Sequence, residues 1–337
     1  MRYQLRQSSI YLSAKDILPY LRTNVKFFLS NKIKNSAGLA SAVAGCRPGW
    51  YNYTKLSEKR SGDMLTPAEF VKFYLDLGEK KTAAPATRLL VLGMLAGLLI
   101  GFGACVSNTA TFAIENPSVA RIISGVLFPF GLFIVIMTGA ELFTGNNLIA
   151  IGVLDRRVRL GGMLRNWLYV YLGNLLGSCI LAAGVTLAGQ LDLGSGALAA
   201  HTIKVAANKC ALSFGKALLL GVFCNILVCI AVMCSSSAKS VPGRAVGAYL
   251  PISFFVICGF EHCVANMYYI PAGLFAKAAP QYAQLIAAAG PNTAQLTWAG
   301  FFINNLLPVT LGNIIGGVLV AWLLWFAYGE KTEKIAV

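Results

Sequence analysis

The sequence predicts an all-α membrane protein of six transmembrane helices, arranged as an inverted repeat in which the second and fifth helices are broken. The first indication is composition, because 57% of the 337 residues are apolar and only 12% are charged, against about 25% charged in soluble domains. The second is the length of uncharged stretches such as 89–106 and 301–328, which match or exceed the ~18 residues that can cross a bilayer. The third is a motif that occurs in both halves of the chain.

Residues 1–63 form a basic N-terminal extension with eleven Lys/Arg against three Asp/Glu, which is +8 of the net charge of +15. No nucleic-acid motif accompanies this charge, so no nucleic-acid partner is expected. The segment also lacks the apolar core of a secretory signal. Three interpretations remain open: a cytoplasmic tail on anionic lipid, a disordered segment, or an untranslated stretch with Met64 as the true start.

Residues 64–87 are predicted to form an amphipathic helix at the cytoplasmic membrane interface. Thr66 is a typical helix cap, Pro67 suits the first helical position, and Glu69 follows two residues later. Apolar side chains then recur at helical spacing opposite a charged face. The apolar positions are Phe70, Phe73, Tyr74 and Leu77, and the charged ones are Lys72, Asp76, Glu79, Lys80 and Lys81.

A transmembrane domain is expected over residues 88–329, followed by a short cytoplasmic tail, 330–337. It contains six hydrophobic units, at about 88–108, 120–154, 164–189, 213–235, 246–278 and 301–328. Units two and five are too long for one straight span, and small or polar residues interrupt them at 138–147 and 259–266. Non-helical backbone at membrane depth persists only where it lines a cavity or is buried in protein. We therefore expect both breaks to lie inside the protein.

Basic residues between the units indicate the topology. Cytoplasmic loops of membrane proteins carry an excess of Lys and Arg. Six spans with both termini in the cytoplasm fit best, which predicts a multi-pass protein of the cell membrane (inner or plasma). The residues concerned are Arg156, Arg157, Arg159 and Arg165 between units two and three, and Lys239 and Arg244 between units four and five.

The motif L-G-N-x-x-G occurs at 172–177 in unit three and at 311–316 in unit six. Each is the third unit of a three-helix half, and three is an odd number, so the halves must run through the membrane in opposite directions. The broken helices are second in each half. We therefore expect the two breaks to meet near the midplane and form the path of a solute.

His262 and Thr144, one in each break, are the first candidates for the centre of that path. A charge at the centre of a span costs roughly 2.5–3.5 kcal/mol, so an ionisable residue there usually faces a cavity and has a role. The alternative for His262 is a neutral ring bonded to a hydroxyl or backbone group that only holds helices together. Thr144 could offer its hydroxyl to this imidazole, cap the following half-helix, or do both.

Several other polar residues in the spans allow two interpretations. The amides of Asn225 and Asn313 could donate to a passing anion or join helices, and for Asn174 we favour the second role. Glu141 and Glu261 hold equivalent places in the two breaks, where they are expected to accept N–H bonds and brace the broken helices. Lys209, before unit four, could concentrate anions at a pore mouth or be an ordinary surface lysine.

The sequence gives no support to an enzyme. Two histidines cannot supply a dinuclear metal site, and there is neither a Gly-rich phosphate loop nor a nucleophile elbow. The nine cysteines include no C-x-x-C pair, so we interpret them as small apolar residues and expect no metal and no cofactor. An aquaporin-type neutral-solute channel is the alternative from another class, although paired Asn-Pro-Ala triplets are absent from the sequence.

Five motifs together resemble the formate/nitrite transporter family. They are E-L-F-T-G-N at 141–146, R-N-W at 165–167, N-x-x-V-C at 225–229, G-F-E-H-x-x-A-N-M at 259–267 and N-L-L-P-V-T-L-G-N at 305–313. The likeness extends over about 66–328, and the motifs occur in the order typical of the family. It implies an aquaporin-like fold that assembles as a homo-pentamer, with one pore in each protomer.

The resemblance also implies the arrangement of the pore. Thr144 would oppose His262, with Asn225 and Asn313 close to a central chamber and Lys209 in the vestibule. Phe128 and Phe255 would form the outer apolar constriction. The inner constriction would comprise Leu132, Leu142, Phe143 and Val228. The substrate would be a small monovalent weak-acid anion, formate or nitrite, with hydrosulfide or lactate as alternatives within the family.

Two apolar rings around a chamber would impose a large dehydration cost on a bare anion. A neutral weak acid would pass much more easily. We therefore hypothesise that the anion enters past Lys209, is held in the chamber, and crosses the rings wholly or partly in its protonated form. Permeation would then be linked to protonation at the central His262, either directly or through an oriented water, although burial disfavours the charged imidazole.

Overall fold

The computed structural model describes residues 64–283 and 291–329; the predicted N-terminal extension and C-terminal tail lie outside these residues. Six helical segments in this part are long and apolar enough to cross a membrane. The prediction of an all-α protein with six spans is therefore confirmed. The spans are α4 (Ala86–Thr111), α5 with α6 (Pro117–Leu127, Phe130–Thr138), α9 (Leu160–Leu187), α11 (Phe214–Ser237), α12 (Val241–Cys258), and η5 with α15 (Gly300–Leu306, Leu307–Tyr328).

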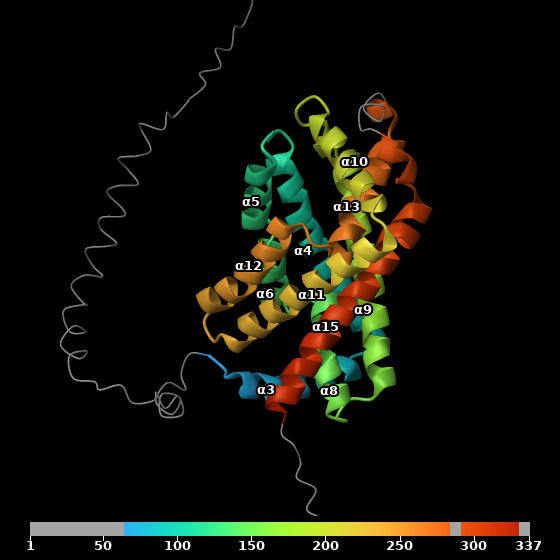
Figure 1. The fold of residues 1–337 in the computed structure, drawn as a ribbon. Helices are drawn as coiled ribbons and strands as arrows, with labels where there is room; N and C mark the ends of the chain where they lie inside the picture. Colours follow the sequence, from blue (N-terminus) through green and yellow to red (C-terminus); the bar gives the residue numbers. More distant parts are fainter. Residues whose placement is uncertain (1–63, 284–290, 330–337) are drawn as a thin grey trace, which may run out of the picture. The chain divides into compact units, whose positions relative to one another are not determined.

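Figure 1 shows α3 (Pro67–Ala83), α8 (Ala150–Leu154) and the C-terminal end of α15 at one end of this unit, and α10 (Ala197–Cys210) at the other. We call these the α3 end and the α10 end. Short helical turns complete the described chain: α7 (Phe143–Asn146), η1 (Asn147–Ile149), η2 (Gln190–Asp192), η3 (Pro280–Tyr282) and η4 (Pro291–Gln295), besides α13 (Cys263–Ala278).

Helix α3 begins where its sequence indicates. The hydroxyl of Thr66 accepts from the backbone N–H of Glu69, and the Glu69 carboxylate accepts from that of Thr66, which is a capping box. The buried face comprises Phe70, Val71, Tyr74 and Leu75, whereas Phe73, predicted on the apolar face, is exposed. The hydroxyl of Tyr74 donates to the carbonyl of Gly145 at 3.0 Å. Helix α3 therefore packs directly against the first break.

Both predicted breaks are present and have the same form. Helix α6 ends at Gly139 with φ 66°, and α12 ends at Gly259 with φ 71°. Glycine adopts this left-handed conformation without the Cβ clash that other residues meet, which explains why a glycine ends each half-helix. Three non-helical residues follow, and the chain becomes helical again at α7 and at α13.

Close packing of two helix pairs explains the repeated L-G-N-x-x-G motif. A Cβ on Gly177 of α9 would lie 2.0 Å from the carbonyl oxygen of Met94 in α4, and one on Gly316 of α15 would lie 2.3 Å from that of Val222 in α11. Only glycine allows the backbones to approach so closely. The motif therefore marks the same helix contact in both halves, with α4 on α9 in one and α11 on α15 in the other.

Helix α10 was not expected from the sequence. Its segment, ALAAHTIKVAANKC, mixes small and polar residues and has no long apolar run. The helix buries Ala199, Ile203 and Ala206 and packs against α13. It carries His201, Lys204 and Lys209 at the α10 end.

We expect Gly177→Ala to destabilise the protein by about 1–3 kcal/mol, because the new methyl group would overlap the α4 backbone. Gly184→Ala in the same helix is the matched control, since a Cβ there has no neighbour within 4 Å. Thermal unfolding in detergent measures both. Equal midpoints for the two variants would contradict the close approach.

Candidate functional site

The two breaks bring Thr144 and His262 together from opposite halves of the chain. The Oγ1 of Thr144 lies 3.0 Å from the Nε2 of His262, and both side chains are buried. The contact expected from the sequence is therefore present. It joins the first turn of α7 to the residue that precedes α13.

The tautomer of His262 follows from its second nitrogen. Nδ1 accepts from the backbone N–H of Ala265 at 3.0 Å, so the ring caps the N-terminus of α13. A neutral ring that accepts at Nδ1 carries its hydrogen on Nε2. Nε2 therefore donates to the Thr144 hydroxyl, whose own hydrogen can be donated to a third group.

An aromatic pair lies on the α10 side of His262. The rings of Phe128 and Phe255 meet edge to face with centroids 5.6 Å apart, and Phe255 stacks on the imidazole at 5.8 Å. Both phenylalanines are buried. The structure thus places the two residues of the predicted outer constriction in contact with each other and next to His262.

A cavity of about 670 Å³ opens beyond the aromatic pair, and we call it the vestibule. Its walls come from α4, α5, α10, α12 and α13 and reach down to His262. Burial lowers the pKa of the His201 imidazole in this wall, and the charge of Lys204 lowers it further. The titratable side chains of the lining are Glu115, Arg121, His201, Lys204, Lys209, Glu261, His262 and Tyr269.

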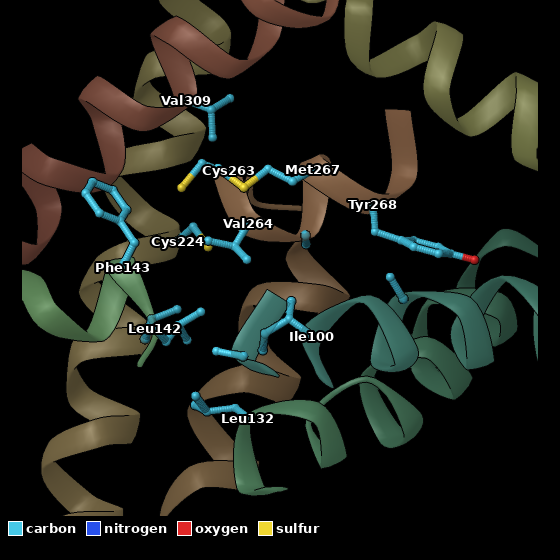
Figure 2. Close-up of a cluster of buried hydrophobic side chains, with 14 of the residues drawn as sticks. Ile100, Leu132, Leu142, Phe143, Cys224, Cys263, Val264, Met267, Tyr268 and Val309 are labelled. Carbon is cyan, nitrogen blue, oxygen red and sulfur yellow. The ribbon is translucent and has the colours of Figure 1, made fainter. Parts of the chain in front are cut away.

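The residues of the predicted inner constriction are all buried, but they do not point to one place. Figure 2 shows Leu132 and Leu142 in one apolar cluster with Ile100, which the sequence did not single out. The ring of Phe143 leaves the backbone in another direction and packs edge to face on Trp167 and Tyr171 of α9, with centroids 5.9 and 4.9 Å away. Val228 of α11 is also buried in the core.

Asn174 and Asn313 hold the two breaks in the same way. The side-chain oxygen of Asn313 accepts from the backbone N–H of Cys263, and its amide donates to the carbonyls of Gly221 and Glu261. Asn174 repeats these bonds in the other half, with Phe143, Gly93 and Glu141 as its partners. Donation by Asn313 to an anion would require one of these bonds to break.

Asn225 of α11 contacts the first break through its side-chain amide. Its amide is within 2.6–3.3 Å of the carbonyl oxygens of Asn313 and Thr144 and the side-chain oxygen of Asn147. Its side-chain oxygen is buried and accepts no hydrogen bond among the described residues. The structure thus brings Asn225 next to the backbone of Thr144.

The two glutamates are each held by a lysine and an asparagine. Lys209 Nζ lies 2.8 Å from the Glu261 carboxylate, which also accepts from Asn266. In the other half, Lys81 Nζ lies 2.7 Å from Glu141, which accepts from Asn146. The positive charge of Lys209 is thus already paired.

The sequence reasoning missed Lys81 and the two asparagines at these ion pairs. One signal was available, because an asparagine follows each glutamate by five residues, at 146 and 266. Asn166 and Asn305 complete the network by accepting from those asparagines and donating to the lysine carbonyls. In the described ranges no group of three or more His, Cys, Asp or Glu side chains is placed to hold a metal ion.

Comparison with known proteins places the chain among transporters. Residues 68–327 match the family described as formate/nitrite transporter. The chain is 35% identical to a probable formate transporter of Methanothermobacter thermautotrophicus, over 78% of this chain and 97% of that one. It is 34% identical to the formate channel FocA of Escherichia coli K12, over 80% and 97%.

Two solved structures have the same fold. A pentameric formate channel with formate bound aligns with a TM-score of 0.63 and 36% identity, over 72% of this chain and 97% of that one. An ion channel of the same family aligns with a TM-score of 0.65 and 26% identity, over 77% and 98%. These likenesses confirm the fold inferred from the sequence.

The buried ion pair at the second break yields a stability prediction. Lys209→Met should destabilise the protein by about 3–5 kcal/mol, because it leaves the Glu261 carboxylate buried without its cation. The double variant Lys209→Met/Glu261→Gln should recover most of this loss. Chemical unfolding in detergent measures both. A single variant as stable as the double one would contradict the prediction.

Arg157→Gln provides the comparison. Arg157 pairs with Asp76 and Glu79 at the α3 end, but these side chains are 34–58% exposed. Exposed pairs contribute about 0–1 kcal/mol. The free energy of unfolding of this variant should therefore be within about 1 kcal/mol of the wild-type value.

Proposed function

The chain belongs to the formate/nitrite transporter family, which comprises channels and transporters rather than enzymes, and we propose that this member conducts formate. The observation that carries the proposal is the Thr144–His262 contact, which joins the two broken helices next to the aromatic pair of Phe128 and Phe255. Formate channels and a formate-bound structure among the similar proteins support the choice of anion.

The apolar groups on either side of this contact support passage in a protonated form. A bare anion would lose its hydration at Phe128 and Phe255 and again at Leu132 and Leu142, without a compensating charge. Formic acid carries no net charge and loses far less. The proposed path therefore holds formate between the constrictions and lets it cross them wholly or partly as the acid.

Thr144 supplies the hydrogen bond that holds the anion. Its hydroxyl accepts from His262 Nε2–H and is polarised by that bond, so it becomes a stronger donor to a carboxylate oxygen. Protonation of His262 at Nδ1 would break its bond to Ala265 and set two N–H groups against each other. In the resting state His262 therefore acts as a neutral donor, and a proton can reach its ring only when the cap of α13 is released.

The proposal includes a membrane orientation and an assembly. Arg157 lies at the α3 end because it pairs with Asp76 of α3. Arg244, in the first turn of α12, donates to the carbonyl of Ala238, next to Ser237, which accepts from the backbone N–H of Leu65 before α3. An excess of basic residues supports a cytoplasmic position for this end in the cell membrane. A homo-pentamer is supported by the similar pentameric channel.

Uptake into proteoliposomes tests the substrate. Formate, nitrite, hydrosulfide and lactate should be compared at two external pH values, together with osmotic swelling in glycerol. We expect formate to be preferred and its uptake to rise about tenfold per pH unit of acidification if only the acid crosses. A preference for nitrite, hydrosulfide or lactate would reassign the substrate within the family. Swelling without anion uptake would favour a neutral-solute channel.

Thr144→Val tests the hydroxyl at constant shape. Because a hydrogen bond to a charged group is worth about 1.5–3 kcal/mol, formate flux should fall at least about tenfold. Thr144→Ser retains the hydroxyl and is the matched control. His262→Asn should also lower the flux and change its pH dependence. Unchanged flux in His262→Asn at every pH would contradict a role for this histidine.

A further inference from the structure

Arg121 of α5 lies against the break in α12, on the wall of the vestibule. Its Nη1 donates to the carbonyl of Ile257 at 3.1 Å, close to the end of α12. A Cβ on Gly259 would lie 2.5 Å from Nη1 and within 3.5 Å of Cζ and Nη2, so the guanidinium covers this glycine. The equivalent glycine of the first break, Gly139, has no neighbour within 4 Å of such a Cβ. Of the two breaks, only the one at Gly259 is therefore covered by a guanidinium.

The contact with Ile257 holds the guanidinium but uses only one of its five N–H donors. Arg121 is exposed and belongs to the vestibule lining, so the remaining donors are accessible from the cavity. A guanidinium fork fits both oxygens of a carboxylate in a bidentate pair. Because the group is already fixed, it loses little side-chain freedom when it binds an anion.

The charge of the vestibule points to the same residue. Of the five charged side chains in the lining, Lys209 and Glu261 neutralise each other. Arg121 and Lys204 then outnumber Glu115. Within the described residues neither Arg121 nor Lys204 forms a salt bridge with a carboxylate. The available positive charge of the vestibule therefore lies above the aromatic pair and not on Lys209.

Arg121 also has a suitable place along the path. Ser124 and Phe128 follow it at intervals of three and four residues, and all three line the vestibule. They therefore share one face of α5, and the seven helical steps from Arg121 to Phe128 span about 10 Å. An anion held at Arg121 would lie two helical turns before the outer constriction.

We propose that Arg121, together with Lys204, forms an entry site that binds a small carboxylate anion before it passes Phe128 and Phe255. Formate as the natural ligand rests on the proposed function, whereas the site itself does not. The site would concentrate anions at the mouth, where the lysine expected to do so is already paired with Glu261.

The test uses the full-length protein in lipid nanodiscs and in proteoliposomes, with sodium formate as the probe. Binding is measured from the line broadening of 13C-labelled formate, and transport from the concentration dependence of initial uptake. Arg121→Gln should raise the half-saturating concentration in both assays about tenfold, the equivalent of one lost charge-assisted pair. Arg121→Lys retains the charge but not the fork. Its half-saturating concentration should lie between those of the wild type and Arg121→Gln.

Lys216→Gln is the matched control, because Lys216 is exposed near the start of α11 at the same end and does not line the vestibule. It removes one positive charge and should leave both half-saturating concentrations unchanged. Equal values for wild type and Arg121→Gln, with only a lower unfolding temperature in the variant, would reduce Arg121 to a cap of α12 and overturn the proposal. If the wild type binds but does not transport formate, the proposed function fails, and the binding assay still decides the site.

Discussion

Two interrupted helices can exist inside a membrane only if the backbone groups that they free are satisfied within the protein. Each break removes hydrogen bonds at a depth where water cannot replace them, and each unsatisfied group would cost several kcal/mol. Asn174 and Asn313 meet this requirement, because each spans a break with one acceptor and two donor contacts. The close packing of the glycine motifs follows from the same need, since these asparagines reach the breaks only when the helices that carry them lie against their partners.

The same scaffold, used twice in opposite directions, gives two different sites. Leu142 follows Glu141 in the first break, and His262 follows Glu261 in the second. His262 caps its helix through a side chain, whereas Leu142 makes no such bond and joins an apolar cluster. The second break thus contributes a ring N–H, and the first contributes an apolar side chain besides the hydroxyl of Thr144. The repeat provides the geometry, and the residue after each glutamate determines the chemistry.

Much of this arrangement could be predicted from the sequence because it depends on strong local signals. Unit length and small or polar interruptions predicted the broken helices, and the motif of unit three identified its counterpart in unit six. Helix α10 was missed because its segment has no apolar run and is stabilised by packing on α13. The roles of Asn225 and Asn313 were left open because a buried amide donates equally well to a carbonyl or to an anion, and only coordinates show that Asn313 already has its partners. Lys81 was not singled out because its distance of sixty residues from Glu141 gives no local signal.

The buried carboxylates of the described residues are each balanced by a lysine, which limits the charge that the proposed path can offer to an anion. Both glutamates are paired with lysines, and the imidazole is fixed in a form that presents an N–H without a positive charge. Added protons would have to displace the backbone N–H of Ala265 at the positive end of α13. The chamber therefore offers directed hydrogen bonds and no net charge. On the proposed path, such a chamber would bind an anion weakly enough for release, and it would favour a solute that can lose its own charge when it crosses the apolar constrictions.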